Sequence, residues 1–309
     1  MMTEEELFAS IYTHDTIYLP PSEQKSAALE VALGCSHAKC RFCDFAKAPF
    51  HIHSLERIRR NMQILGQFRP DAYRLFLLGE NAFVLDYEKL SVIFDMTDQY
   101  MPNIHEFAMY SRIDDIARKT DEELRFLHQM GLTTLHIGLE SGSDSILLEQ
   151  IKGVTSMDML TQLRRLEDVG IEYYVTIILG LGGRHFSVHH ALSTARLLNQ
   201  LHPADIWCLK LKLWEDTPLY KDVKKGHFDM MNDAEMLWEE RILLENLAVT
   251  DCMFHDTTVL NTYTIQGHLP EEKPSICYCH PADRNDTFLC TSYKEKGQRL
   301  KMLSLPLSR

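Results

Sequence analysis

Residues 31–43 read VALGCSHAKCRFC, so an apolar run ends in the closely spaced Cys35, Cys40 and Cys43. A closed zinc or iron–sulfur site takes four protein ligands, and this segment offers three thiolates. A metal centre built on them would keep an open coordination position. An open position is typical of a centre that takes part in chemistry.

Two other interpretations of these cysteines stay open. A structural zinc ion would need a fourth ligand, which His37, His51 or His53 could supply. Three unrelated cysteines are the less favoured alternative, because the chain of 309 residues has only eight cysteines and three of them fall within nine positions.

Short apolar strands alternate with helical segments through most of the chain. Thr120 ahead of three acidic residues is a good helix start. Six such units indicate a parallel sheet, curled into a partial barrel or doubly wound, whose carboxyl-end loops carry function. The expected strands are 27–33, 73–78, 106–110, 134–139, 173–179 and 205–213, and the expected helices are 54–68, 87–99, 120–130, segments from 143 and 157, 188–200 and 234–247.

The cysteine loop after the first strand resembles that of the radical S-adenosylmethionine (SAM) superfamily, although the commonest spacing there has one residue fewer between the first two cysteines. The resemblance implies that Cys35, Cys40 and Cys43 ligate a [4Fe–4S] cluster whose fourth iron binds SAM, and that Phe42 packs against adenine. It also implies an α/β fold, a partial (β/α)6 TIM-like barrel at 26–260. Residues 1–25 would be a lead-in and 261–309 a small C-terminal extension.

Other motifs resemble further parts of the SAM site. Glu140 precedes Ser-Gly-Ser, as in methylthiotransferases and oxygen-independent coproporphyrinogen dehydrogenases, and the apolar strand before Gly180 resembles an adenine-binding strand end. Ser143 is also a candidate helix cap, and Arg112 a candidate partner of a neighbouring aspartate. The residues that the resemblance assigns to SAM are Gly79, Glu80, Asn81, Ser111, Arg112, Glu140, Ile178 and Leu179.

Catalytic residues can only be nominated from strand alternation. If Glu140 points into the barrel, His136 does so too, and neighbouring strands offer Tyr110 and Lys210. A lone histidine or tyrosine inside a barrel is more often structural. Tyr110, His136 and Lys210 are therefore the candidate catalytic residues.

Composition restricts the partners. Lys plus Arg is 32 and Asp plus Glu is 44, a net charge of −12, which disfavours nucleic acid and anionic membranes. No apolar run is long enough to span a bilayer, and the acidic start is unlike a signal peptide, so we expect a cytoplasmic protein with reduced cysteines. The resemblance implies a small-molecule or peptide substrate and an electron donor such as flavodoxin or ferredoxin.

The expected function is reductive cleavage of SAM to a 5′-deoxyadenosyl radical that abstracts hydrogen from substrate. The alternatives are a non-catalytic SAM- or haem-binding relative and a tRNA-modifying methylthiotransferase-like enzyme. Near the C-terminus, Cys277, Cys279, His280 and Cys290 are either structural or ligands of a second metal centre.

Overall fold

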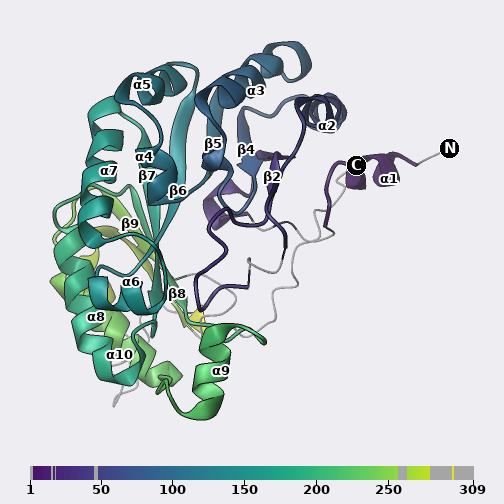
Figure 1. Cartoon of the computed structure of the whole chain (residues 1–309). Helices are drawn as coiled ribbons and strands as arrows, with labels where there is room; N and C mark the ends of the chain where they lie inside the picture. The colour runs from purple at the N-terminus through teal and green to yellow at the C-terminus, as the bar shows by residue number, and fades with distance from the viewer. Residues whose placement is uncertain are drawn as a thin grey trace.

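A curved sheet of eight strands forms the centre of the computed structural model (Figure 1), which describes residues 3–14, 17, 19–44, 48–256, 263–278 and 294–295. The strands lie in the order β1 (Ala27–Glu30), β4 (Arg74–Leu78), β5 (Glu106–Ser111), β6 (Leu132–Glu140), β7 (Glu172–Leu179), β8 (Asp205–Lys210), β9 (Cys252–His255) and β11 (Gln266–Leu269). All neighbouring pairs are parallel except the last, in which β11 runs antiparallel to β9.

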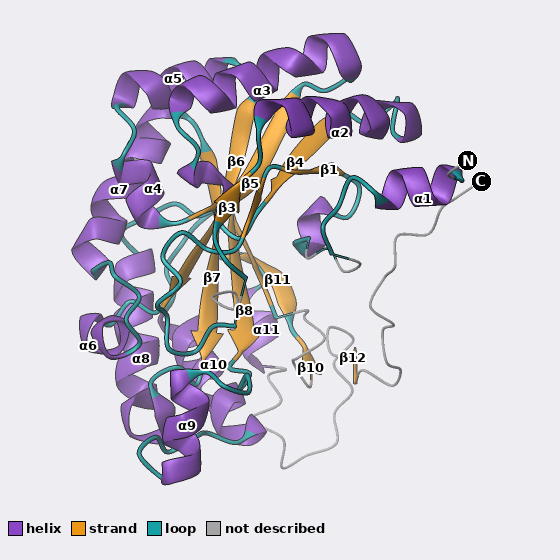
Figure 2. Cartoon of the chain, turned by 45° about the vertical axis from the view of Figure 1, so that its right-hand side comes forward, coloured by secondary structure: helices purple, strands orange, loops and turns teal. Residues whose placement is uncertain are grey.

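Helices cover the outer face of this sheet, while the lead-in lies on its inner side (Figure 2). The helices of the described chain are α1 (Glu4–Ala9) in the lead-in, and then α2 (Leu55–Phe68), α3 (Tyr87–Tyr100), α4 (Ile113–Ala117), α5 (Asp121–Gln129), α6 (Asp144–Glu149), α7 (Ser156–Val169), α8 (Gly183–Leu198), α9 (Pro218–Lys225), α10 (Asp233–Asn246) and α11 (Lys273–Tyr278). The two short ladders pair β2 (Ala32–Leu33) with β3 (His51–Ile52) and β10 (Tyr263–Thr264) with β12 (Lys294–Glu295). Among the described residues, no helix has the length and apolar character needed to cross a membrane.

Period-two alternation gives the sheet two different faces. Leu75 and Leu77 of β4 belong to the large core under the helices, whereas Phe76 and Leu78 join Ala28 and Ala108 in a smaller cluster on the inner face. On β7 the buried residues likewise alternate with half-buried ones. The inner face therefore remains available for a ligand site, because the helices bury only the outer one.

The expected fold class is confirmed, and the structure adds two strands to the six expected. β9 and β11 extend the sheet beyond β8. Both are four residues long, which is why their weak pattern escaped notice. The Thr120 capping box is present, with Glu123 as its partner. Helix α8 begins at Gly183, five residues before the expected 188, because Gly182 and Gly183 continue into the helix.

The expected lead-in and extension both contact the barrel. The Tyr12 hydroxyl donates to the Ala28 carbonyl at 3.0 Å, and Ile17 and Leu19 pack against the inner apolar cluster. Because β11 pairs with β9, the expected boundary at 260 falls between two strands of one sheet. The boundaries themselves stay predictions.

Glu23 fastens the lead-in to the middle of the sheet. Its carboxylate accepts from Arg74 of β4 and from His136 Nε2 of β6, the latter at 3.0 Å, and its side chain is 1% exposed. Burial alone raises the pKa of Glu23, but hydrogen bonds from His136, Arg74 and Ser26 outweigh burial and lower it to about 2.

We predict that Glu23→Gln destabilises the protein most at neutral pH. A carboxyl pKa lowered from 4.5 to about 2 corresponds to about 3 kcal/mol of stability, present above pH 4.5 and lost as pH falls towards 2. Denaturation curves of wild type and variant should therefore converge below pH 4.5. The exposed Glu5→Gln is the control, and a stability difference independent of pH would contradict the prediction.

Candidate functional site

The cysteine loop, residues 34–44, lies at the carboxyl ends of the strands and is anchored to distant segments. The backbone N–H of Arg41 donates to the Gln150 carbonyl at 3.0 Å, and that of Leu219 donates to the Arg41 carbonyl at 2.9 Å. Gly34 has φ +65°, and a Cβ there would come 2.5 Å from the Ala48 carbonyl oxygen. The loop is thus held from α6 on one side and α9 on the other.

The three thiols of this loop are half-buried. Burial raises the pKa of Cys40, while Lys152 and Arg112 act in the opposite direction. In the part of the chain that the structure describes, no group of three His, Cys, Asp or Glu side chains surrounds a point suited to a single metal ion. The thiolates of a three-cysteine cluster loop bind three different irons and need no such common point.

Two of the three histidines considered for a zinc site have protein partners. His37 Nε2 donates to the Ile151 carbonyl at 2.7 Å, and His53 Nε2 lies 2.8 Å from a Glu30 carboxylate oxygen. His51 stacks against His53 with ring centroids 5.3 Å apart. These contacts favour a structural role for His37 and His53. Of the proposed second metal centre, Cys279, His280 and Cys290 lie outside the described residues, and Cys277 is half-buried on α11.

The turn after β4 approaches the cysteine loop. Asn81 accepts from the backbone N–H of Ser36 at 3.1 Å and donates to the Ser36 hydroxyl at 2.7 Å and to Asp115 at 2.8 Å. Gly79 has φ +152°, and a Cβ there would press against Ala32 at 3.1 Å. Glu80 lies in this turn, and burial raises its pKa. Asn81 therefore braces the loop, while Glu80 Oε2 has no hydrogen-bond partner among the described residues.

Ser111 and Arg112 follow β5 and are both buried. The Arg112 guanidinium donates to Asp114 at 2.8 Å and to the Lys152 carbonyl at 2.9 Å, so the expected pairing with a neighbouring aspartate is present. The Ser111 hydroxyl donates to the Arg112 carbonyl at 2.9 Å. Their assignment to SAM stays a prediction.

Glu140 ends β6 in a left-handed backbone conformation, with φ +68°. Its Oε1 lies 2.8 Å from Lys152 Nζ, and both side chains are nearly buried. The carboxylate folds back over Gly138, where a Cβ would come 2.2 Å from Oε1. This close approach requires glycine at 138.

A second buried pair holds the backbone of Glu140. His190 Nδ1 lies 3.0 Å from Glu239 Oε1, and Nε2 lies 3.2 Å from the Glu140 carbonyl. Both neighbours are acceptors, so both contacts are hydrogen bonds only when the ring carries two protons. Glu239 also accepts from the backbone N–H of Gly180 at 2.7 Å. The ends of β6 and β7 are thereby fixed to α8 and α10.

The remaining residues considered for the SAM site lie in different environments. Phe42 is 8% exposed and packs into the core beside the cysteine loop. On β7, Ile178 is half-buried on the inner face, whereas Leu179 is buried on the helix side. Ser143 occupies the N-cap position of α6, but its hydroxyl contacts Ser145 and His189 and makes no cap bond.

The three nominated catalytic side chains do not lie together. Tyr110 and His136 are neighbours inside the barrel, with ring centroids 5.9 Å apart. Lys210 ends β8 and pairs with Asp233 of α10. His136 is committed to Glu23, so its structural interpretation has direct support.

Sequence reasoning missed Lys152, His190 and Glu239. Lys152 stands in the Ile-Lys-Gly segment after the Glu140 motif, and a lysine twelve residues after an inward-facing carboxylate was an available signal. His190 and Glu239 carry no local signal, because they meet Glu140 only through packing of α8 and α10.

The residues fit the two groups that the sequence resemblance implies. The Oε2 atoms of Glu80 and Glu140 are buried and have no hydrogen-bond partner among the described residues. Two orphaned carboxylate oxygens near three thiols suit a ligand that carries an ammonium and hydroxyl groups. The donor set therefore matches a cluster with an open iron and an adjoining SAM.

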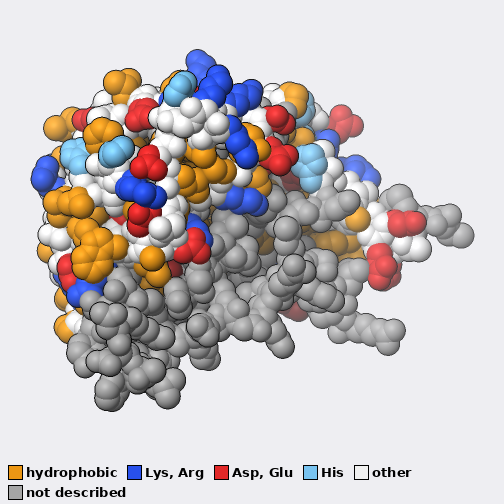
Figure 3. Space-filling view, turned by 90° about the horizontal axis from the view of Figure 1, so that it is seen from below, with side chains coloured by type: hydrophobic (Ala, Val, Ile, Leu, Met, Phe, Trp, Pro, Cys, Tyr) orange, Lys and Arg blue, Asp and Glu red, His pale blue; other side chains and the backbone are white. Residues whose placement is uncertain are grey.

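Figure 3 views the molecule from the side on which β7 and β8 end. Over the coloured part of this face, basic, acidic and hydrophobic side chains are interspersed. The exposed apolar residues Leu148 of α6, Met157 of α7 and Phe186 of α8 all lie near the start or end of their helices.

We predict that Lys152→Met costs about 3 kcal/mol of stability, because it leaves the Glu140 carboxylate buried without its cation. The double variant Lys152→Met/Glu140→Leu should recover part of this loss in urea denaturation. Breaking the exposed Arg165–Asp121 pair with Asp121→Asn is the control and should cost at most about 1 kcal/mol. Equal losses in both single variants would contradict the prediction.

Comparisons with known proteins agree with this geometry. The chain is 28% identical over 228 residues to the heme chaperone HemW of Bacillus subtilis (strain 168), covering 69% of this chain and 58% of HemW. The chain thus spans less than two thirds of the curated relative it matches.

Solved structures share the fold at low sequence identity. The radical SAM methyltransferase TsrM from Kitasatospora setae matches with a TM-score of 0.55 and 14% identity, over 70% of this chain and 44% of TsrM. Methylornithine synthase (PylB) matches with a TM-score of 0.51 and 12% identity, over 80% of this chain and 68% of PylB.

The family model of the Radical SAM superfamily matches residues 29–198, which contain the cysteine loop, the turn after β4 and Glu140. The match covers more than half of the chain. This chain belongs to the radical SAM superfamily, whose cofactors are a [4Fe–4S] cluster and SAM.

Proposed function

We propose that this protein is a radical SAM enzyme acting on a small molecule or peptide inside its barrel. Cys35, Cys40 and Cys43 would ligate the cluster, and the mouth of the barrel would bind SAM. The observation that carries this proposal is the pair of buried carboxylates, Glu80 and Glu140, each with an unpartnered oxygen near the cysteine loop.

When bound, the cluster and SAM together supply a 5′-deoxyadenosyl radical that removes a hydrogen atom from substrate. The protein's part is to bind, orient and shield. With three thiolates, the loop leaves one ligand position for SAM. The anchors at Gln150 and Leu219 would hold the loop that carries the three thiolates in place at the mouth.

Glu80 and Glu140 would accept hydrogen bonds from the ammonium or the ribose hydroxyls of SAM. Lys152 would offer its ammonium to the SAM carboxylate while remaining paired with Glu140. His190 and Glu239 would act as positioning residues, since they hold the backbone of Glu140 and Gly180.

The lead-in supports a substrate site within the barrel. Residues 19–23 cross the inner face below the mouth, where Pro20, Pro21 and Ser22 line a pocket with Tyr110 and His136. An enclosed site excludes water from a reactive radical. A reductant such as flavodoxin or ferredoxin would supply the electron, and cytoplasmic thiol chemistry would keep the three cysteines reduced.

A haem-binding function is the second candidate, because the chain is similar to a heme chaperone over 69% of its length. Absorbance titration with haemin, with and without SAM, addresses this candidate. Tight haem binding without any 5′-deoxyadenosine formation would favour it over the enzyme.

We predict that replacing Cys35, Cys40 and Cys43 together with Ala abolishes the brown absorbance of the reconstituted protein, because all three cluster ligands are lost. Cys277→Ala is the control and should retain about four irons per chain. Iron that survives the triple change would assign the cluster to another part of the chain.

We predict that the anaerobically reconstituted, reduced protein forms 5′-deoxyadenosine from SAM. Glu140→Gln should weaken SAM binding about tenfold to a hundredfold, because a charged hydrogen-bond acceptor is lost. The exposed Glu149→Gln, on the adjoining helix, is the control. Unchanged SAM affinity in Glu140→Gln by calorimetry would give Glu140 a purely structural role.

A further inference from the structure

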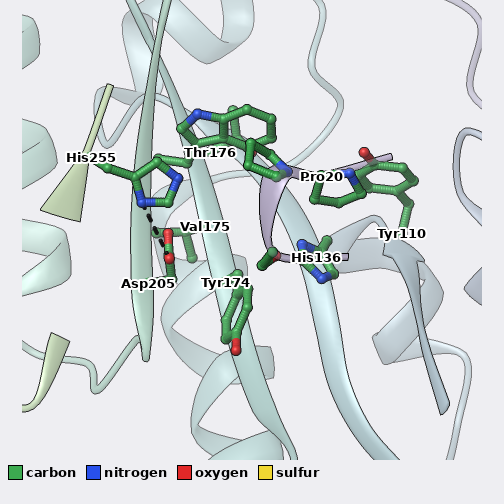
Figure 4. A pocket seen from close by; sticks show the side chains of 11 residues that line it. Pro20, Tyr110, His136, Tyr174, Val175, Thr176, Asp205 and His255 are labelled. Atoms are coloured by element: carbon green, nitrogen blue, oxygen red, sulfur yellow. Dashed lines mark ion pairs between the residues drawn. The ribbon is translucent and has the colours of Figure 1, made fainter. Parts of the chain in front are cut away.

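A pocket lies inside the barrel, on the amino-terminal side of the mouth (Figure 4). Its walls come from five neighbouring strands and from the lead-in. Asp205 and His255 stand on one side, His136 and Tyr110 on the other, and Tyr174 lies between them. The lining residues are Pro20, Pro21, Ser22, Tyr110, His136, Tyr174, Val175, Thr176, Asp205, Trp207 and His255.

Asp205 is the acid of this lining, and it is 8% exposed. The lining side chains that the structure describes include no lysine or arginine. His255 Nδ1 lies 3.3 Å from Asp205 Oδ2, but burial lowers the pKa of His255 to about 4 and keeps the ring neutral. Without a cation beside it, burial raises the pKa of Asp205 to about 7.

The remaining walls are aromatic. Tyr174 stacks edge-on against His136 at 4.9 Å, and Trp207 lies 5.8 Å from the His255 ring. The indole Nε1 of Trp207 is buried and has no hydrogen-bond partner among the described residues. A carboxylate surrounded by aromatic side chains is an arrangement that binds organic cations. This indole N–H could donate a hydrogen bond to an acceptor atom beside the cation.

We infer that this pocket binds an organic ammonium group, with Asp205 as its counter-ion and Trp207 donating to a neighbouring oxygen of the same ligand. The inference rests on the proposed function, since it assigns this group to the substrate. His136 and Glu140 are four residues apart on β6, which is about 13 Å along a strand. A substrate anchored at Asp205 would therefore extend towards the mouth, where its hydrogen atom is removed.

Among the described groups that face the pocket, Asp205 is the one whose pKa lies near 7. Glu23 of the lead-in has a pKa lowered to about 2, and His255 of β9 one lowered to about 4. Burial lowers the pKa of His136 on β6 and raises those of Tyr110 on β5 and Tyr174 on β7. Between pH 6 and 8, an ammonium ligand should therefore displace a proton from Asp205 alone.

The test is calorimetric titration of the full chain with protonated 2-aminoethanol, a small probe that carries an ammonium and a hydroxyl. Affinity should rise about tenfold from pH 6 to pH 8, because the ionised fraction of a carboxyl with pKa about 7 rises about tenfold. Titrations at pH 7 in two buffers of different ionisation enthalpy should report about half a proton released per probe bound.

Matched probes and variants separate the contacts. Removing the cation, with ethanol, should abolish the pH dependence. Asp205→Asn should weaken probe binding at pH 8 about tenfold or more, whereas the exposed neighbour Glu172→Gln should not change it. Trp207→Phe should weaken binding of 2-aminoethanol but not of ethylammonium, which lacks the oxygen.

Equal affinity for charged and neutral probes, or binding independent of pH in the wild type, would overturn the inference. These wild-type measurements decide the matter even if Asp205→Asn does not fold. Neither cluster nor SAM is needed for them. A failure of the ammonium pocket is therefore distinguishable from a failure of the proposed radical chemistry, which iron content and 5′-deoxyadenosine report.

Discussion

The buried contact between the Glu140 carboxylate and the Lys152 ammonium is the interaction on which the site depends. It ties the end of β6 to the segment after α6, and that segment holds the other parts in turn. The Lys152 carbonyl accepts from Arg112, and the Ile151 carbonyl accepts from His37 of the cysteine loop. A buried charge pair tolerates little rearrangement, because separating it leaves a charge without a partner. The pair therefore helps to fix the position of the cysteine loop.

The two faces of the sheet differ in the charged residues that they hold. Helices bury the outer face of the sheet, so apolar side chains gather there. Inner positions also hold carboxylates at two levels, Glu140 at the mouth and Asp205 three or four residues deeper along the strands. Glu140 is paired with the Lys152 ammonium, whereas no lysine or arginine among the described residues lines the pocket around Asp205. We therefore assign Glu140, whose charge is compensated, to the cofactor site and Asp205 to the substrate site.

The lead-in is held on the inner face of the sheet by a buried carboxylate whose charge is compensated. The Glu23 carboxylate of the lead-in accepts hydrogen bonds from Arg74 and His136. Because Arg74 also pairs with Glu106, the contact is a network across neighbouring strands and not an isolated bridge. Such a network fixes His136 as a wall of the interior pocket.

The positions of six strands along the chain, the Thr120 cap, the cysteine loop and the glycine-rich strand ends followed from the sequence alone, because each depends on neighbours within a few residues. Strand alternation also placed His136 on the inner face. Only the tertiary structure decided which distant groups meet: His190 with Glu140, fifty residues apart, and Asp205 with the last strands of the sheet. The register shift between Gly138 and Glu140 adds to this, since it alters the alternation at the site itself. Partners of buried charges are set by packing of whole elements, and a sequence pattern gives the face of each element but not the side chain that lies opposite.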